Sequence, residues 1–185
     1  MKAVAEHGRG AVVDIHYADR RTWAPSRRSI GTWVDAALGA RASGEVAVRV
    51  VGNAESRRLN RTWRGKDKPT NVLSFPGATR VLAKRSQAPS SRRYSSDAAP
   101  LPLGDLVVCA PVVAREAREQ GKSRSAHWAH MIVHGTLHLL GHDHVKAADA
   151  QRMERREIVI LKRFGFSNPY VAGGSARRER QRQHG

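Results

Sequence analysis

Three histidines near one another in the sequence have the spacing of metal ligands. His134 and His138 are four residues apart, so on a helix they lie one turn apart, about 6 Å, on the same face. Two imidazoles at that separation can share one tetrahedral metal ion. Gly141 can adopt a left-handed conformation, turn the chain and bring His144 towards the same ion. We therefore predict a zinc site on His134, His138 and His144, with a fourth position open to water as in catalytic centres.

Neighbouring histidines leave the ligand set partly open. His130 lies one turn before His134 and could also bind the metal, although a hydrogen-bonding role is the expectation for it. His142 competes with His144 for the place of third ligand. We favour His144, because His142 follows the turn so closely that its reach towards the metal is short. His127 is expected to be a packing residue.

Gly135 argues against one well-known use of such a site. The histidine segment resembles the metzincin protease pattern, in which a glutamate follows the first histidine and takes a proton from water. Here that position is Gly135. A metalloprotease is therefore disfavoured, and three neutral imidazoles leave the full charge of the metal available for an anionic phosphodiester.

A second group of candidate residues forms a basic loop, Arg64-Gly-Lys-Asp-Lys68, between an expected helix and an expected strand. A guanidinium group can bind a phosphate through two hydrogen bonds and stays charged at any relevant pH. Our hypothesis is that Arg64 stabilises the charge of a phosphoryl-transfer transition state. The groove that holds the nucleic-acid strand is expected to be lined by Lys66, Lys68, Asn71 and Ser74.

These segments resemble the YbeY family of bacterial rRNA maturation endoribonucleases. The resemblance rests on the histidine segment with the preceding Ala126–His130, and on three further blocks: Trp63–Pro76, Leu103–Cys109 and Phe164–Tyr170. It implies that the three motif histidines bind zinc and that Arg64 is catalytic. It also implies rRNA and the small ribosomal subunit as partners, with a ribosomal protein and an assembly GTPase as further candidates. Three departures are His142, where the family commonly has tyrosine, the length and basic character of segment 79–102, and the Arg-rich extension after Tyr170.

The elements that must position these residues follow from hydrophobic periodicity and turn residues. Strands are predicted over residues 11–17, 45–51, 70–75 and 103–110. Helices are predicted over 29–38, from an N-cap at Asn53, from Pro111 to Gly121, from an N-cap at Ser125 to about Leu140, and over 146–164. We expect an α+β fold with one domain (11–170), a small mixed sheet of about four strands packed with helices, and the metal site on a central helix.

Composition narrows the choice of partner. The 185 residues carry 33 Lys and Arg against 16 Asp and Glu, a net charge of +17, which indicates a polyanionic partner. A basic flexible insertion (79–102) and a disordered Arg-rich tail (171–185) account for only part of this excess. Neither a membrane span nor a signal peptide is evident, and the single cysteine, Cys109, fits a reducing compartment. We expect a cytoplasmic protein that binds neither membranes nor DNA.

The sequence thus predicts a zinc-dependent, single-strand-specific endoribonuclease. Its action on the 3′ end of small-subunit rRNA and in ribosome quality control is implied by the resemblance alone. The alternative is a ribosome-assembly factor that binds RNA and whose metal is mainly structural. No convincing general base is apparent.

Overall fold

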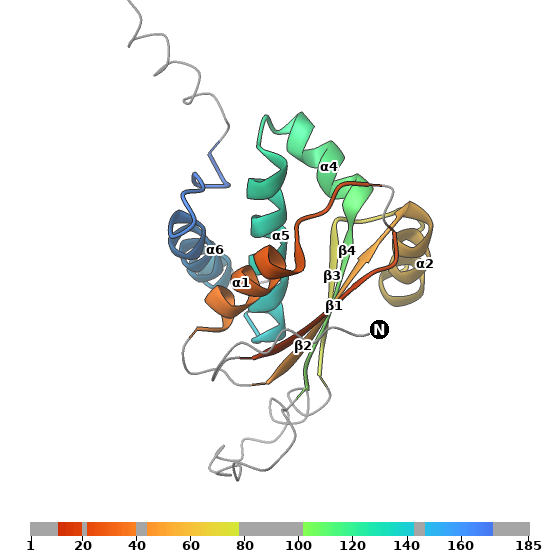
Figure 1. The fold of residues 1–185 in the computed structure, drawn as a ribbon, viewed down its shortest axis with the longest axis horizontal. Helices are drawn as coiled ribbons and strands as arrows, with labels where there is room; N and C mark the ends of the chain where they lie inside the picture. Colours follow the sequence, from red (N-terminus) through yellow and green to blue (C-terminus); the bar gives the residue numbers. More distant parts are fainter. Residues whose placement is uncertain (1–10, 20–21, 40–43, 78–101, 143–146, 172–185) are drawn as a thin grey trace, which may run out of the picture.

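The computed structural model describes residues 11–19, 22–39, 44–77, 102–142 and 147–171. The elements follow one another in this order: β1 (Val12–Tyr17), α1 (Arg27–Leu38), β2 (Glu45–Val51), α2 (Asn53–Arg64), β3 (Val72–Pro76), β4 (Pro102–Cys109), α4 (Ala110–Glu119), α5 (Arg124–Leu139) and α6 (Ala147–Lys162) (Figure 1). Most of the predicted insertion 79–102 and tail 171–185 lies outside the described residues, although Pro102 already belongs to β4.

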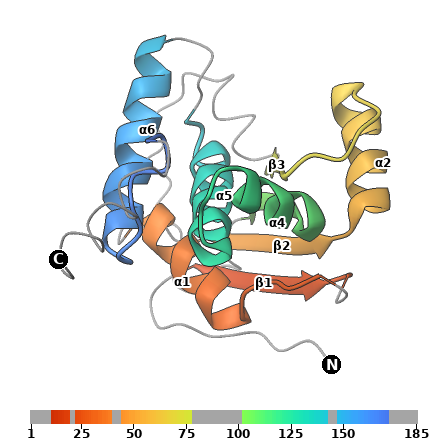
Figure 2. The ribbon, with the colours of Figure 1, turned by 90° about the horizontal axis from the view of Figure 1, so that it is seen from above.

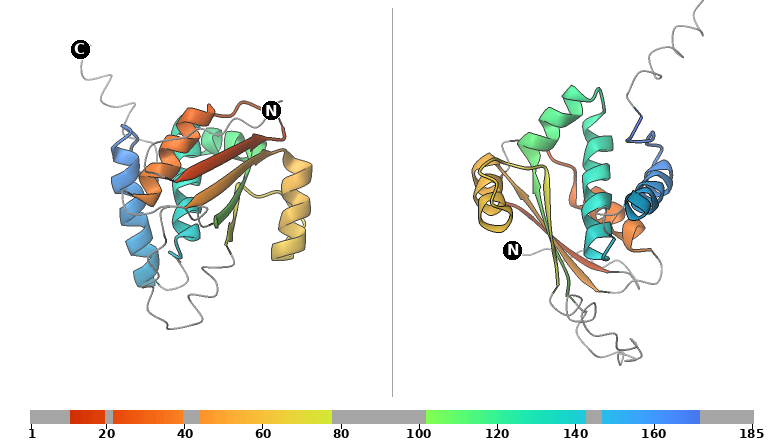
Figure 3. Two further views of the ribbon diagram at one scale, coloured as in Figure 1. Left: turned by 60° about the horizontal axis from the view of Figure 1, so that its bottom comes forward. Right: turned by 180° about the vertical axis from the view of Figure 1, so that it is seen from behind.

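The four strands form one mixed sheet in the order β1-β2-β4-β3. β1, β2 and β4 run parallel, and β3 is an antiparallel edge strand beside β4. The expected α+β fold with a four-stranded mixed sheet is confirmed. Helices α1 and α5 cover one face of this sheet with α6 outside them, while α2 lies on the opposite face (Figures 2 and 3).

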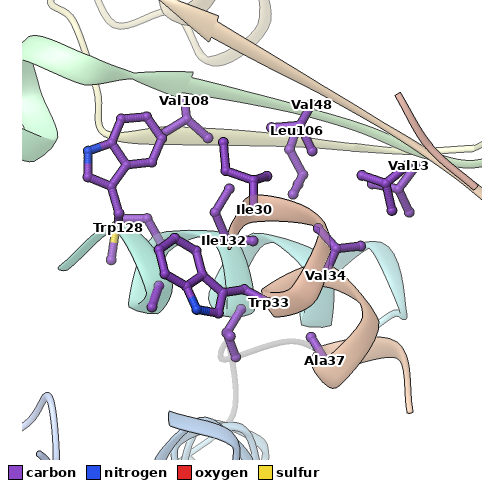
Figure 4. Packing of buried hydrophobic residues seen from close by; sticks show 14 of the residues in the cluster. Val13, Ile30, Trp33, Val34, Ala37, Val48, Leu106, Val108, Trp128 and Ile132 are labelled. Carbon is purple, nitrogen blue, oxygen red and sulfur yellow. The ribbon is translucent and has the colours of Figure 1, made fainter. Parts of the chain in front are cut away.

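The main hydrophobic core lies between the sheet and helices α1 and α5. Trp128 of α5 packs there beside Val108 of the sheet, and Trp33 lies on the side of α1 that is farther from the strands (Figure 4). Ile132 and Leu137 of α5 are almost wholly buried. Burial of side chains of this size stabilises the fold by roughly 1.5–3 kcal/mol each. This packing fixes α5, and with it every histidine that the helix carries, against the centre of the sheet.

A smaller cluster packs on the opposite face. Leu73, Val107 and Cys109 project from β3 and β4 towards the partly buried Leu59 of α2. Because side chains alternate along a strand, Val72 and Ser74 point instead to the α5 side. Edge strand β3 therefore contributes to both faces of the sheet.

Two predicted N-caps differ from those in the structure, and α1 begins at Arg27, two residues before its predicted start. The N-cap of α2 is Gly52 and Asn53 is its first helical residue, so Asn53 is not the cap. The N-cap of α5 is Ser123, not Ser125, because the Ser123 side chain accepts a hydrogen bond from the backbone N–H of Ala126. Both corrections shift a boundary by one or two residues and leave the element in place.

Candidate metal centre

Helix α5 places four histidines along one stripe. His127, His130, His134 and His138 recur at intervals of three or four residues, and each ring meets the next edge to face. The ring centroids of the first three are about 6 Å apart (6.2 and 6.1 Å), whereas those of His134 and His138 are only 4.7 Å apart. The last pair is the one that the sequence predicts to bind metal.

The imidazoles of His134 and His138 turn the same nitrogen towards each other. Their Nε2 atoms lie 3.2 Å apart. Two nitrogen ligands of one tetrahedral zinc ion, each about 2.0–2.1 Å from the metal, are about 3.3 Å from one another. The two rings therefore fit a shared zinc ion. The predicted juxtaposition of His134 and His138 is present in the structure.

The turn after α5 has the conformation that the third-ligand prediction requires. Gly141 has a φ of +80°, in the left-handed region. His144 itself lies outside the described residues, so its role as third ligand stays a prediction. His142 is described, and its Nε2 lies 3.0 Å from the guanidinium Nη1 of Arg156. A nitrogen that accepts a hydrogen bond from an arginine is not free to bind a metal.

A buried glutamate, Glu157 of α6, holds the outer nitrogen of His134. Its Oε1 atom lies 2.8 Å from His134 Nδ1, and its Oε2 atom accepts hydrogen bonds from His130 Nε2 at 3.2 Å and from the Tyr170 hydroxyl. Burial acts to raise the pKa of this carboxyl, but hydrogen bonds from His130, His134 and Tyr170 lower it to about 2. Glu157 is therefore ionised and keeps the proton of His134 on Nδ1, which leaves the Nε2 lone pair for a metal.

The same residues form a second possible donor set. His130, His134 and Glu157 each offer one ligand atom, and these atoms lie within 4.8 Å of one another, so this group could also hold a metal ion. His130 is buried, and burial lowers the pKa of its imidazole despite the opposing effect of Glu157. The lowered pKa favours the neutral imidazole, which is the form that a metal ligand requires.

Sequence reasoning missed Glu157 and predicted the packing role of His127 correctly. A signal for Glu157 was present: on α6 it lies on the same stripe as Met153, Ile160 and Leu161, where a charged residue needs a partner. His127 is 2% exposed and its Nε2 lies 2.9 Å from a Glu116 carboxylate oxygen.

Gly135 is fixed by packing. A Cβ atom at this position would lie 2.9 Å from Leu106 Cδ2, 3.2 Å from Ser74 Oγ and 3.3 Å from Val72 Cγ2. A Cβ atom at position 135 therefore requires these side chains of β3 and β4 to shift. A glutamate is much larger than a Cβ atom and would need a larger rearrangement, so the packing favours glycine over a protease-type base here.

The predicted catalytic loop begins at the C-terminal end of α2. Arg64 is the last residue of α2, and Gly65 caps it in the left-handed conformation with a φ of +66°. The loop backbone is anchored through the Asn60 amide, which donates to the Lys68 carbonyl at 2.7 Å. Arg64, Lys66 and Lys68 all have exposed side chains. They are thus available to an anionic ligand.

The two remaining loop candidates are engaged within the protein. The Asn71 amide donates to the Glu116 carboxylate at 3.1 Å, and its oxygen accepts from the backbone N–H of Val72 at 2.7 Å. Ser74 is half-buried where β3 meets Gly135 of α5. Their predicted contact with RNA stays untested.

Comparison with known proteins identifies the family. Residues 17–165 match the family model described as Endoribonuclease YbeY. The chain belongs to the YbeY family. Membership makes it an RNA-processing nuclease with RNA as its substrate class. A solved structure similar to this YbeY-family chain is the solution structure of TM1509 from Thermotoga maritima, with 20% sequence identity, a TM-score of 0.47, and coverage of 86% of this chain and 99% of that one. Among the described residues, no helix has the length and apolar character that crossing a bilayer requires.

Proposed function

We propose that this protein is a zinc-dependent endoribonuclease that cuts single-stranded RNA in the cytoplasm. Its role in this proposal is maturation of the 3′ end of small-subunit rRNA and ribosome quality control. The observation that carries the metal dependence is the pair of facing Nε2 atoms on His134 and His138, backed by the buried carboxylate of Glu157. Family membership supports RNA as the substrate. The net charge of +17 supports a polyanionic partner.

In this proposal His134, His138 and His144 hold the zinc ion. A bound zinc ion would supply a Lewis acid beside the scissile phosphate. Glu157 orients His134 by accepting its Nδ1 proton, and His130 and Tyr170 hold Glu157 in turn. The carboxylate of Glu157 thus acts through His134 and does not contact the substrate.

The exposed cations of the loop after α2 bind the RNA backbone. Arg64 donates hydrogen bonds to the phosphate on which charge develops, and Lys66 and Lys68 bind neighbouring phosphates. Small-subunit rRNA, a ribosomal protein and an assembly GTPase are the partners that the family resemblance implies.

One observation favours a second candidate, an RNA-binding assembly factor with a structural metal. The donor set His130, His134 and Glu157 includes two buried residues, and closed sites are typical of structural metals. In that case the metal stabilises the packing of α6 on α5 and performs no chemistry.

Metal content separates the two candidates. We expect protein purified without added metal to contain about one zinc ion, and a His138→Ala variant to lose it. His16→Ala is the matched control, because His16 lies on β1 and is exposed. Elemental analysis measures the ratio. Zinc retained by His138→Ala but lost in His130→Ala would assign the metal to the buried group instead.

Cleavage assays test the role of Arg64. We expect Arg64→Ala to retain zinc and to cut single-stranded RNA at least 100-fold more slowly, because removal of a donor to transition-state charge costs about 10²–10³-fold in rate. Unchanged turnover with metal retained would remove Arg64 from the mechanism. Cleavage that a chelator does not abolish, in a chain that stays folded, would contradict the metal dependence.

A further inference from the structure

A pocket opens on the outer face of the sheet, opposite the histidine helix. Its volume is about 560 Å³, within the range of small-molecule sites. Strands β1, β2, β4 and β3 form its floor, and α2 borders it. Nothing in the proposed metal centre uses the residues that line it, among them Asp14, Ala47, Asp105, Phe75 and Trp63.

The floor of the pocket is one row of residues across the sheet. Asp14 pairs with Ala47, Ala47 with Asp105, and Asp105 with Phe75, so all four side chains share this face. The small Ala47 leaves a depression between two carboxylates that stand two strand spacings, about 10 Å, apart. Neither Asp14 nor Asp105 has a hydrogen bond or ion pair with another described residue. They are therefore available as hydrogen-bond acceptors.

The next row of residues across the sheet, together with Glu55 of α2, carries no net charge. Arg49 donates to Glu55 at 2.8 Å, and its other nitrogen lies 3.0 Å from His16 Nδ1. Arg49 and Glu55 neutralise each other and hold each other in place. The charge that the pocket offers to a ligand is thus that of Asp14 and Asp105.

An aromatic pair closes the end of the pocket beside Asp105. Trp63 of α2 meets Phe75 of β3 edge to face, with ring centroids 5.7 Å apart. Trp63 is 65% exposed, although an indole of this size usually gains from burial. Trp63 lines the pocket, and Phe75, which it contacts, is paired with Asp105 across β3 and β4. Flat rings that also carry N–H donors are the ligands that such a combination fits, and nucleobases have both features.

Exposed arginines of α2 accompany this pocket. Arg58 and Arg61 each have side chains that are 66% exposed, and their nearest acidic partners, Glu55 and Asp67, are 4.0 Å away. Arg64 is exposed at the end of the helix. An RNA strand would therefore place its phosphates on α2 and a base in the pocket. A cationic peptide could pair with the two aspartates, but the exposed arginines of α2 would repel it.

We propose that this pocket binds one unpaired base of the RNA strand, stacked on Trp63, with Asp105 accepting hydrogen bonds from its Watson–Crick edge. Guanine is the base that fits best, because its N1–H and N2–H₂ groups are adjacent donors and an ionised carboxylate is purely an acceptor. Asp14 closes the far side of the depression. The pocket thus sets a preference for a base on the strand that the enzyme binds.

The test compares the affinity of the protein for two RNA heptamers, U7 and the same RNA with guanine at its centre. Fluorescence anisotropy on ice measures binding, and electrophoresis checks that the RNA stays intact. We expect the full chain to bind the guanine-containing RNA about tenfold more tightly. Trp63→Ala should weaken its binding about tenfold, as loss of one stacking platform does, and Trp63→Phe should restore most of the affinity. Trp23→Ala, which removes another exposed tryptophan, is the control and should change nothing.

Asp105→Asn tests the edge contact. We expect this variant to bind U7 as well as the wild type does or better, and to lose the preference for guanine. Equal tightening of both RNAs, with the preference retained, would mean that Asp105 only repels phosphate and would overturn the proposal. Unchanged RNA binding by the Trp63→Ala variant would also overturn the proposal. The same holds if Trp63→Ala weakens the binding of a basic nonapeptide but not the binding of RNA. Because binding is measured without cleavage, a failed metal centre would leave the guanine preference intact.

Discussion

At the scale of single residues, the metal centre depends on a carboxylate that is wholly buried. Glu157 is 0% exposed and accepts hydrogen bonds from His130, His134 and Tyr170. Burying a charge is costly unless several partners compensate it, and here three donors converge on the two oxygens. The arrangement fixes both the tautomer and the direction of His134. It is the carboxylate–histidine pairing that many metal sites use to orient a ligand.

A Glu157→Gln substitution tests this orienting role. Glutamine keeps the shape but loses the charge and one acceptor, so we expect zinc affinity to fall about 10–100-fold while some binding remains. Competition with a chelating dye measures the affinity. Glu119→Gln is the matched control, because Glu119 is an exposed glutamate that pairs with Arg115 at 3.6 Å. Near-complete loss of zinc would instead identify Glu157 as a direct ligand, and unchanged affinity would remove it from the site.

The histidine pair could be predicted from the sequence and its carboxylate partner was not. His134 and His138 are one helical turn apart, so their spacing alone fixes their approach once α5 is a helix. Glu157 is 23 residues further along and belongs to another helix. Its contact depends on how α6 packs on α5, which no local pattern encodes. A charge on an apolar stripe shows that a partner exists but not which one.

At the scale of elements, periodicity located every described strand and helix, and helix starts were the weak point. Ser123 and Ser125 are both suitable N-caps, and the choice between them depends on which side chain reaches a free backbone N–H. The order of strands in the sheet was beyond local reasoning. It places β3 at an edge, where alternate residues serve opposite faces, and it brings Asp14 and Asp105 into one row. The outer pocket therefore had no sequence signature.

Two helical glycines provide a test of how closely α5 packs on the sheet. Alanine at position 135 would meet Leu106 and the side chains of β3, whereas a Cβ at Gly31 of α1 would meet nothing within 4 Å. We expect Gly135→Ala to lower the free energy of unfolding by about 1–3 kcal/mol through overpacking. Gly31→Ala should raise it by about 0.5–1 kcal/mol, because alanine is the better helix former. Urea titration measures both, and a shift of the same sign in both variants would contradict the packing described here.

At the scale of the whole molecule, charge is distributed unevenly around the sheet. The chain carries a net charge of +17, yet the pocket on the outer face presents two aspartates without described partners. Exposed arginines lie on α2, the helix that borders that pocket. A uniformly basic surface would bind any polyanion alike. Hydrogen-bond acceptors on the face that α2 borders allow affinity for the RNA backbone and discrimination between bases to come from different residues. The arginines supply affinity for the backbone, and the pocket supplies discrimination between bases.

The dependence of RNA binding on salt concentration measures how much the arginines contribute to affinity for the RNA backbone. For a single strand, each phosphate contact contributes about 0.7 to the slope of log K against log salt concentration. If Arg58 and Arg61 each bind a phosphate, the double variant Arg58→Ala/Arg61→Ala should reduce the magnitude of the slope by about 1.4 and weaken binding to all sequences equally. The double variant Arg152→Ala/Arg155→Ala on α6 is the control, because it also removes two exposed arginines, but from the other side of the molecule from α2. Equal effects in both variants would mean that the strand has no defined path along α2 and that attraction to RNA comes from net charge alone.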